Sequence, residues 1–423
     1  MKHILIVVPP ALSCICFFLL RSKRRSPSII WYFYIALVLL ALGFFFYRAI
    51  EAVNNPKVYD FTAFFLWGKT AANGYDFYLP QNLQLVFNSL QLPPLDYKLF
   101  TVDTVNVGFF YPPPTILYFA PLGFLSYKPA MVCWSILNVC FAFGSIYFIY
   151  DLFFRKYKLN GLILVTTLFL FLKPVLDTIS FLQTNFIVLF YLLLIKKYSD
   201  KKIAGVFVAL AMFTKPYMAV LLVFFVLKKK WNTVIYFLLS SIIIAGLTLL
   251  FFGSDPFKSY LTNSPIHRMP LWLFSEPINQ SLHAVLLRLN LISVDKSYMY
   301  VAISVGIALL STRYLLLLTK RRLYDYILPY LLLIGLLIYP GTLSYYGVSL
   351  LFIIFQFFGE EKPLGFNPYV TTVAVAVLFY LSTFSTFLCI CFLLGVILFK
   401  SIGEMLTQDN LKNGFERGVS EIN

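Results

Sequence analysis

Asp60 is the carboxylate whose place in the chain most favours a chemical role. It follows a long apolar run and precedes an aromatic-rich segment, in the stretch "NNPKVYDFTAFFLWGKTAANGYDFYLP" at residues 54–80. A carboxylate at the edge of apolar surroundings can accept the proton of an attacking hydroxyl. An Asp before an apolar helix is also a common N-cap, and Gly74 is typical of the end of such a helix. The residues alone leave cap and base as equal alternatives, whereas Asp76 is expected to be a turn residue.

Lys215 is the second candidate, because it interrupts a short apolar run. Residues 203–227 begin and end at basic clusters, so the chain must go out and return within that stretch. Each arm then has about eleven residues, or roughly 16 Å of helix. Pro216 removes a backbone donor and disfavours helix at the residue before it, which predicts a short hairpin broken there. A lysine at such a break favours a functional role over one that only reaches the membrane surface or pairs with a carboxylate.

Other cations of the chain have side chains suited to binding an anion. Arginine matches phosphate oxygens with a fork of donors, and lysine acts as a point charge. Arg288 follows Ser281 at helical spacing, so we expect Asn279 to cap that helix and direct its N-terminus toward an anion. The alternative is that Arg288 belongs to an amphipathic helix at the membrane surface. The phosphate-binding candidates are Lys215, Arg268, Arg288 and His267.

The elements that must position these residues are membrane-spanning helices. Hydrophobic residues make up 60% of the chain and charged residues 12%, with a mean hydropathy of +0.82, which excludes a soluble globular domain. Charge-free runs at 29–46 and 234–252 are long enough to cross a membrane as helices and lack the alternation of β-barrel strands. We therefore predict an all-α polytopic membrane protein with about 11–13 transmembrane helices and short hairpins.

The basic residues lie in short clusters between the apolar runs. Such clusters are typical of cytoplasmic loops, and they account for the net charge of +16 without nucleic acid as a partner. The two longest non-apolar stretches, about 49–113 and 253–297, are then extracytoplasmic loops that carry Asp60 and the candidates near residue 268. The clusters are at residues 21–25, 155–158, 196–202, 228–230 and 320–322.

The chain is expected to form one membrane domain over residues 1–400, followed by a polar tail over 401–423 that is cytoplasmic and partly disordered. It shows no internal repeat. All six cysteines lie in apolar runs, so we expect neither a disulfide framework nor a cysteine metal site. His267 and His283 are expected to be structural, because no carboxylate accompanies them at metal-ligand spacing.

Five motifs in order resemble those of glycosyltransferase family 87, in the GT-C superfamily. They are "YDFTAFFLWGKTAANGYDFY", "FFYPPPTILYFAPLGFL", "LQTNFIVLFYLLLI", "IAGVFVALAMFTKP" and "NQSLHAVLLRL". The similarity runs from about residue 30 to about residue 350. The motifs also resemble those of polyprenyl-phosphate-mannose-dependent mannosyltransferases. It implies a GT-C-like bundle in the plasma membrane, with an extracytoplasmic site, a polyprenyl-phosphate sugar donor, and a glycan or glycolipid acceptor. It also implies no metal or other cofactor, and an aspartate base at the position of Asp60.

Two segments depart from the family pattern. Leu182 in "LQTN" stands where the family usually has Gly, and Tyr345 stands where a His is typical. Tyr345 would then act as a neutral hydrogen-bonding group. Gln183 and Asn185 are expected either to bind sugar hydroxyls or to tie the hairpin together. The substrate-binding candidates are Gln183, Asn185, Asn279 and Tyr345.

Taken together, the residues and the resemblance predict hexosyl transfer with inversion, because a single carboxylate suits one direct displacement. The alternative is a flippase or transporter of lipid-linked sugars. That reading would predict inverted repeats and charges along a central path. An inactive scaffold is a third alternative, since the family His is missing.

Overall fold

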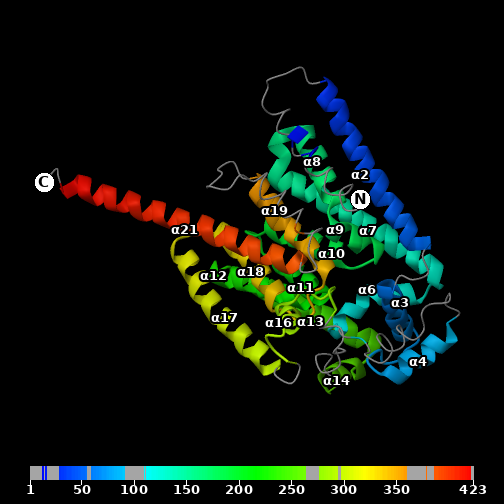
Figure 1. The fold of residues 1–423 in the computed structure, drawn as a ribbon. Coiled ribbons are helices and arrows are strands. Elements are labelled where there is room, and N and C mark those ends of the chain that lie inside the picture. Colours follow the sequence, from blue (N-terminus) through cyan, green and yellow to red (C-terminus); the bar gives the residue numbers. More distant parts are fainter. Residues whose placement is uncertain are drawn as a thin grey trace.

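The computed structural model is helical throughout the part of the chain that it describes. The described residues are 12–13, 15–16, 28–54, 59–90, 109, 111–262, 276–293, 297–359, 378 and 385–420. Within these ranges Asn279 and Leu343 form an isolated antiparallel bridge, and every longer regular element is a helix (Figure 1).

Five helical stretches are long and apolar enough to cross a membrane. Shorter apolar helices accompany them, as expected for a bundle that contains hairpins. The prediction of an all-α polytopic membrane protein is therefore confirmed. The long stretches are α2 (Ser28–Asn54), α7 (Tyr127–Ile149) continuing to α8 (Lys158–Phe171), α13 (Trp231–Phe252), α17 (Ser297–Lys320) and α21 (Ser385–Ser420).

Two predicted boundaries differ from the structure. Helix α2 continues to Asn54, beyond the predicted loop start near residue 49, and an ion pair of 2.7 Å between Arg48 and Glu51 lies along its last turns. Residues 401–420, at the start of the predicted tail, continue α21 as a helix, and the partial disorder expected of the tail stays a prediction. Arg321 holds this extension through an ion pair of 2.5 Å with Asp409.

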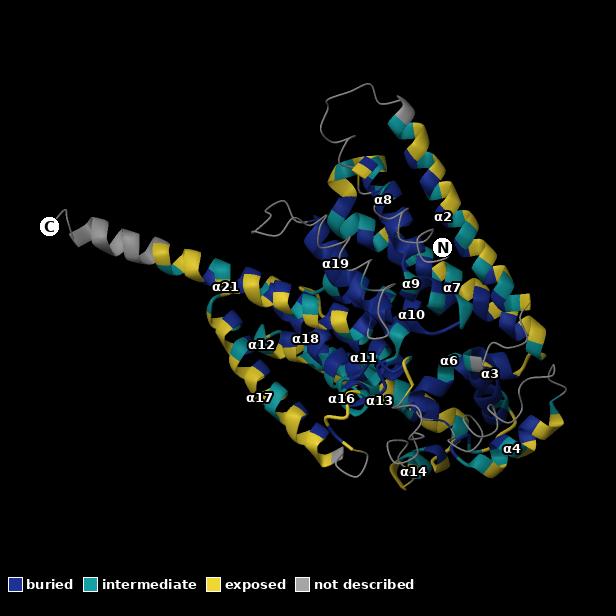
Figure 2. Ribbon diagram, in the orientation of Figure 1, coloured by how far each residue is buried: buried dark blue, intermediate teal, exposed yellow. Residues whose placement is uncertain are grey.

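Apolar side chains cover the outside of the bundle as well as its interior. Helices α10 (Asn185–Lys197), α18 (Tyr324–Ile338) and α19 (Leu350–Gly359) form a buried centre, whereas α2 and α17 carry many exposed residues (Figure 2). Leu310 on α17 is 71% exposed. Apolar faces of this size are what lipid contact requires.

A hairpin formed by α8, α9 (Lys173–Ser180) and α10 precedes the one predicted at residues 203–227. Lys197 at the end of α10 lies 2.9 Å from Asp151, shortly before α8 begins, so the two ends of the hairpin meet. The turn between α9 and α10 carries Gln183 and is therefore at the opposite end.

The hairpin predicted at residues 203–227 breaks where the sequence indicated. Helix α11 (Ala204–Thr214) ends at Lys215, whose φ of −145° and ψ of 112° are extended, and η5 (Pro216–Leu221) and α12 (Leu222–Leu227) follow. Asp200 lies 3.6 Å from Lys228 and 3.2 Å from Lys230, which joins the two open ends. Lys215 is thus at the closed end.

The described parts of the two predicted outer loops lie together, at the end opposite the basic clusters at 155–158, 196–202, 228–230 and 320–322. Helices α3 (Tyr59–Ala72), α4 (Pro80–Ser89) and α14 (Asp255–Thr262) gather at the lower right of Figure 1. Ser259 donates a hydrogen bond of 2.5 Å to Asp76, whose side chain also accepts from the Tyr78 amide at 2.9 Å. Asp76 is therefore the turn residue that the sequence predicted.

Helix α3 carries Asp60 and is fixed at both its C-terminus and its side. Gly74 has a φ of 78°, and the amides of Gly74 and Tyr75 bond to the carbonyls of Ala71 and Thr70, which is a Schellman motif. Along its length α3 packs on α6 (Ile116–Gly123) through Gly68. A Cβ atom there would overlap the Phe119 carbonyl of α6.

We predict that Gly68→Ala destabilises the protein by about 3 kcal/mol, because the added methyl must separate two helix backbones. Gly43→Ala is the matched control, since a Cβ atom at Gly43 meets nothing within 4 Å. Thermal denaturation in detergent measures both variants. The packing account is wrong if Gly68→Ala denatures at the temperature of Gly43→Ala.

Candidate active site

Asp60 lies in the first turn of α3 rather than before the helix. Its side chain is half-buried and within hydrogen-bonding range of Gln183. Lys215 is close enough to act on it electrostatically. Three candidate site residues that are far apart in the sequence therefore meet at one place.

The pKa of Asp60 is raised from its usual value of 3.8 to about 6. Burial is the main cause, because it disfavours the charged form. The hydrogen bond from Gln183 and the positive charge of Lys215 act in the opposite direction and limit the rise. A carboxyl with a pKa near 6 is ionised at neutral pH, yet it is a better proton acceptor than an exposed Asp.

Gln183 connects Asp60 to Tyr345. The Gln183 side-chain amide donates to the Tyr345 hydroxyl at 3.2 Å, and both side chains are buried. Tyr345 belongs to η8 (Ser344–Ser349), which packs against α9 and α10. The residue at the position of the family His is therefore a neutral hydrogen-bonding partner in the same cluster as Asp60.

Lys215 is fully buried and held by two tyrosines. Its ammonium donates to the Tyr346 hydroxyl at 2.7 Å and to the Tyr111 hydroxyl at 3.1 Å. It also lies 4.1 Å from the centre of the Tyr346 ring and 5.1 Å from that of Tyr111. Hydroxyl acceptors and ring faces together offset part of the cost of burying the charge.

Tyr111 reaches Lys215 because the proline segment after it is rigid. Pro112 has the dihedral angles of polyproline II, with φ of −57° and ψ of 149°, and the η2 turn (Pro113–Thr115) leads into α6. The Thr115 hydroxyl donates to the carbonyl of Phe213, two residues before Lys215. The segment is therefore rigid, and α6, which follows it, is largely buried.

Three buried oxygens on consecutive residues lack partners within the described part of the chain. They are the side-chain oxygens of Gln183, Thr184 and Asn185. The Asn185 amide nitrogen donates to Thr178 at 3.3 Å, so this side chain ties the hairpin together at one end. Unsatisfied buried acceptors are costly, and they are suited to the hydroxyl donors of a ligand.

The predicted cap on the helix near Arg288 is corrected by the structure. Ser281, not Asn279, is the N-cap of α16 (Leu282–Arg288), and its hydroxyl accepts from the Ala284 amide at 3.2 Å. Asn279 precedes it and accepts from the Ser281 amide at 3.0 Å. The cap position is therefore two residues later than predicted.

Asn279 and Arg288 support the segment that carries Tyr345. The Asn279 amide donates to the Pro340 carbonyl at 3.2 Å, and this residue forms a bridge with Leu343. Arg288 donates to the backbone carbonyls of Glu276 and Asn279, each at 2.6 Å. These contacts give both residues a structural role, and phosphate or sugar binding by either stays a prediction.

The remaining candidates are histidines and Arg268. His267 and Arg268 lie outside the described residues. His283 is buried and stacks on Tyr300 with ring centres 4.5 Å apart, which agrees with the predicted structural role. Across the described ranges no three His, Cys, Asp or Glu side chains gather as metal ligands would. The expectation that the protein uses no metal stays a prediction.

Sequence reasoning missed Tyr111, Tyr346 and Thr184. Tyr346 follows the predicted Tyr345 directly, and Tyr111 precedes the proline run that was quoted for the family resemblance. A lysine inside an apolar hairpin needs hydroxyl or aromatic partners. The tyrosines in and near the family motifs were therefore the signal that could have identified Tyr111 and Tyr346.

The fold and this cluster define an all-α membrane protein with a carboxylate and a buried lysine at the closed ends of its hairpins. A profile of glycosyltransferase family 87 matches residues 109–343, which is more than half of the chain. The chain therefore belongs to glycosyltransferase family 87 and is a membrane glycosyltransferase. The matched segment includes Gln183 and Lys215, whereas Asp60 and Tyr345 lie outside it. No curated protein and no solved structure gives a significant match.

The glycine that the family resemblance predicts at the position of Leu182 would have a conformational reason. Leu182 has a φ of 51°, in the left-handed region that glycine adopts without strain. Its carbonyl accepts from the Trp134 indole at 2.7 Å, and its side chain is fully buried. Burial of a leucine contributes about 1.5–3 kcal/mol, which exceeds a strain of about 1–2 kcal/mol.

We predict that glycine is more stable than alanine at position 182, the opposite of their usual order within a helix. Both Leu182→Ala and Leu182→Gly lose the buried side chain, but only glycine relieves the strain, so the glycine variant should be more stable by about 1 kcal/mol. At Leu189, buried within α10, the alanine variant should be the more stable by a similar amount. Thermal denaturation of the four variants decides, and the same order at both positions would contradict the strain.

Proposed function

We propose that this protein transfers a hexose from a polyprenyl-phosphate donor to a hydroxyl of a glycan or glycolipid, with inversion. The site would face the outside of the plasma membrane. Mannose is the first sugar to test, because the motifs resemble those of mannosyltransferases. The observation that carries the proposal is the meeting of Asp60 with the fully buried Lys215 in one polar cluster.

The two charges have complementary tasks in such a displacement. The acceptor oxygen attacks the anomeric carbon of the sugar while the bond from that carbon to the phosphate oxygen breaks. Asp60 takes the proton of the acceptor hydroxyl. The electron pair leaves with the polyprenyl phosphate, whose negative charge is stabilised by the Lys215 ammonium. Tyr111 and Tyr346 position that ammonium.

The hairpin turn beside Asp60 is the proposed sugar subsite. The unsatisfied oxygens of Gln183, Thr184 and Asn185 are acceptors, and each sugar hydroxyl is a donor. Gln183 would also orient the Asp60 carboxylate through its amide. A single carboxylate in this arrangement supports inversion, since retention by double displacement requires a second nucleophile.

The location of the site supports a donor with a lipid tail. Lys215 and Gln183 lie at the closed ends of two hairpins, at the end of the bundle away from the basic clusters. The basic clusters are predicted to be cytoplasmic. Membership of a glycosyltransferase family favours transfer over the alternative of a flippase without transferase activity.

We predict that Asp60→Asn lowers the transfer rate by about 10²–10⁴-fold, because the amide cannot accept the proton. The assay follows labelled hexose from a panel of polyprenyl-phosphate sugars into membrane lipid extract. Asp76→Asn is the matched control, since this second outer carboxylate serves a turn. Equal transfer by Asp60→Asn and wild type would remove Asp60 as the base. No transfer by wild type with any donor would count against the proposed reaction.

The proposed base also predicts a pH profile. Because the pKa of Asp60 is raised to about 6, the base should remain protonated below that pH. The value of kcat/KM should then fall about tenfold per pH unit below 6. Lys215→Met should move this limb to higher pH, because the positive charge that lowers the pKa is lost. A limb near pH 4, as for an exposed Asp, would contradict this account.

A further inference from the structure

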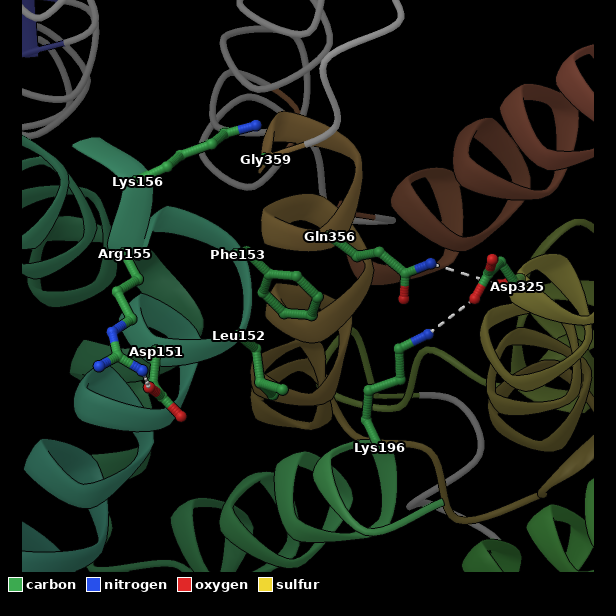
Figure 3. A pocket seen from close by; sticks show the side chains of 9 residues that line it. All are labelled: Asp151, Leu152, Phe153, Arg155, Lys156, Lys196, Asp325, Gln356 and Gly359. Carbon is green, nitrogen blue, oxygen red and sulfur yellow. Dashed lines mark hydrogen bonds and ion pairs between the residues drawn. The ribbon is translucent and has the colours of Figure 1, made fainter. Parts of the chain in front are cut away.

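A second polar pocket lies at the end of the bundle opposite the proposed active site. Its volume is about 400 Å³. It is formed where α7 ends in a π-helical turn (Tyr150–Phe154), beside the last turn of α10, the first turn of α18 and the end of α19 (Figure 3). The catalytic proposal uses none of its residues. The lining residues are Asp151, Leu152, Phe153, Arg155, Lys156, Lys196, Asp325, Gln356 and Gly359.

The charges of this pocket are mixed. Lys196 lies 3.1 Å from Asp325, and Arg155 lies 3.6 Å from Asp151. Cationic and anionic side chains therefore line the same cavity, and Asp325 and Arg155 are exposed at its rim. A ligand with a single negative charge would meet both carboxylates, so the lining favours a group that carries both signs of charge.

Gln356 supplies the second observation. Its side chain is only 5% exposed, and its amide nitrogen donates to the Asp325 carbonyl at 3.3 Å. Its amide oxygen has no hydrogen-bond partner in the described part of the chain. In Figure 3 this oxygen is directed into the space between Phe153 and Lys196. A buried acceptor of this kind is suited to an N–H or O–H donor of a ligand.

We propose that this pocket binds the phosphoethanolamine headgroup of a membrane lipid. The phosphate would lie against the Lys196 ammonium. The primary ammonium has three N–H donors, which match the Gln356 oxygen and the Asp325 carboxylate. Leu152 and Phe153 give the pocket an apolar wall. Its place at the helix ends with the basic clusters is the level at which lipid headgroups lie, which favours a lipid over a soluble phosphoethanolamine ester.

Choline lipids provide a sharp comparison, because they keep the phosphate and the positive charge but have no N–H donor. We expect native mass spectrometry of the purified protein to show about tenfold stronger retention of phosphatidylethanolamine than of phosphatidylcholine, the factor expected for one hydrogen bond to a buried acceptor. Phosphatidylglycerol, which carries a net negative charge, should be retained less than phosphatidylethanolamine. Equal retention of the ethanolamine and choline lipids would overturn the proposal, and so would preferential retention of phosphatidylglycerol.

Variants test the residues named. Gln356→Leu should reduce the preference for ethanolamine over choline to near one, and Asp325→Asn, at an exposed position, should reduce it without affecting folding. Gln84→Leu is the matched control, since Gln84 lies on α4 at the other end of the bundle and bonds only locally to Asn88. An undiminished preference in both Gln356→Leu and Asp325→Asn would overturn the assignment.

Competition by a water-soluble compound distinguishes a membrane lipid from a soluble phosphoethanolamine ester as the ligand. Glycerophosphoethanolamine at the same headgroup concentration should not displace bound phosphatidylethanolamine, because it lacks the chains that hold the lipid at the bundle. Displacement at equal concentration would overturn the lipid as the ligand and indicate a soluble phosphoethanolamine compound. None of these measurements depends on sugar transfer, so their outcome is independent of the proposed reaction.

Discussion

The burial of the Lys215 ammonium is the constraint on which the half of the structure around Asp60 depends. A cation removed from water needs polar partners within a few ångströms, or its burial is prohibitively costly. Here the partners are the hydroxyls and ring faces of two tyrosines and a nearby carboxylate, which come from three separate segments. The proline segment, the η8 turn and helix α3 must therefore all approach the break in one hairpin.

Close backbone packing makes this convergence possible. Gly68 lets α3 lie directly on α6, and Gly205 lets α11 lie directly on α13, because a Cβ atom at either position would meet the backbone of the neighbouring helix. Helix α6 in turn continues from the proline segment that delivers Tyr111. Small residues at helix contacts are a common means of packing in membranes, where apolar burial drives helix association less than in water.

The broken hairpins explain why a polar site can exist beside lipid. At the closed end of each hairpin, backbone groups and polar side chains have no partners within a helix. Such groups are tolerated only where protein or an aqueous cavity satisfies them. The left-handed Leu182 and the extended Lys215 are the residues at which the two hairpins turn or break. The same turns leave acceptors on Gln183, Thr184 and Asn185 without partners, as a site for a hydroxyl-rich ligand requires.

The sequence by itself determined the class of fold, the place of the break at Lys215, the end of α3 at Gly74 and four members of the cluster. These follow from local physics: apolar length, the missing donor of Pro216, the φ preference of glycine, and the cost of a charge in an apolar run. Only the tertiary structure decided that Asp60, Gln183, Lys215 and Tyr345 meet, because contacts between distant segments leave no periodic signal in one sequence. The tyrosines around Lys215 could not be predicted for the same reason, since many of the 29 tyrosines lie in similar apolar contexts. The cap at Ser281 was misplaced because Asn279 and Ser281 are both good caps, and the bridge to Leu343, a long-range contact, holds Asn279 outside the helix.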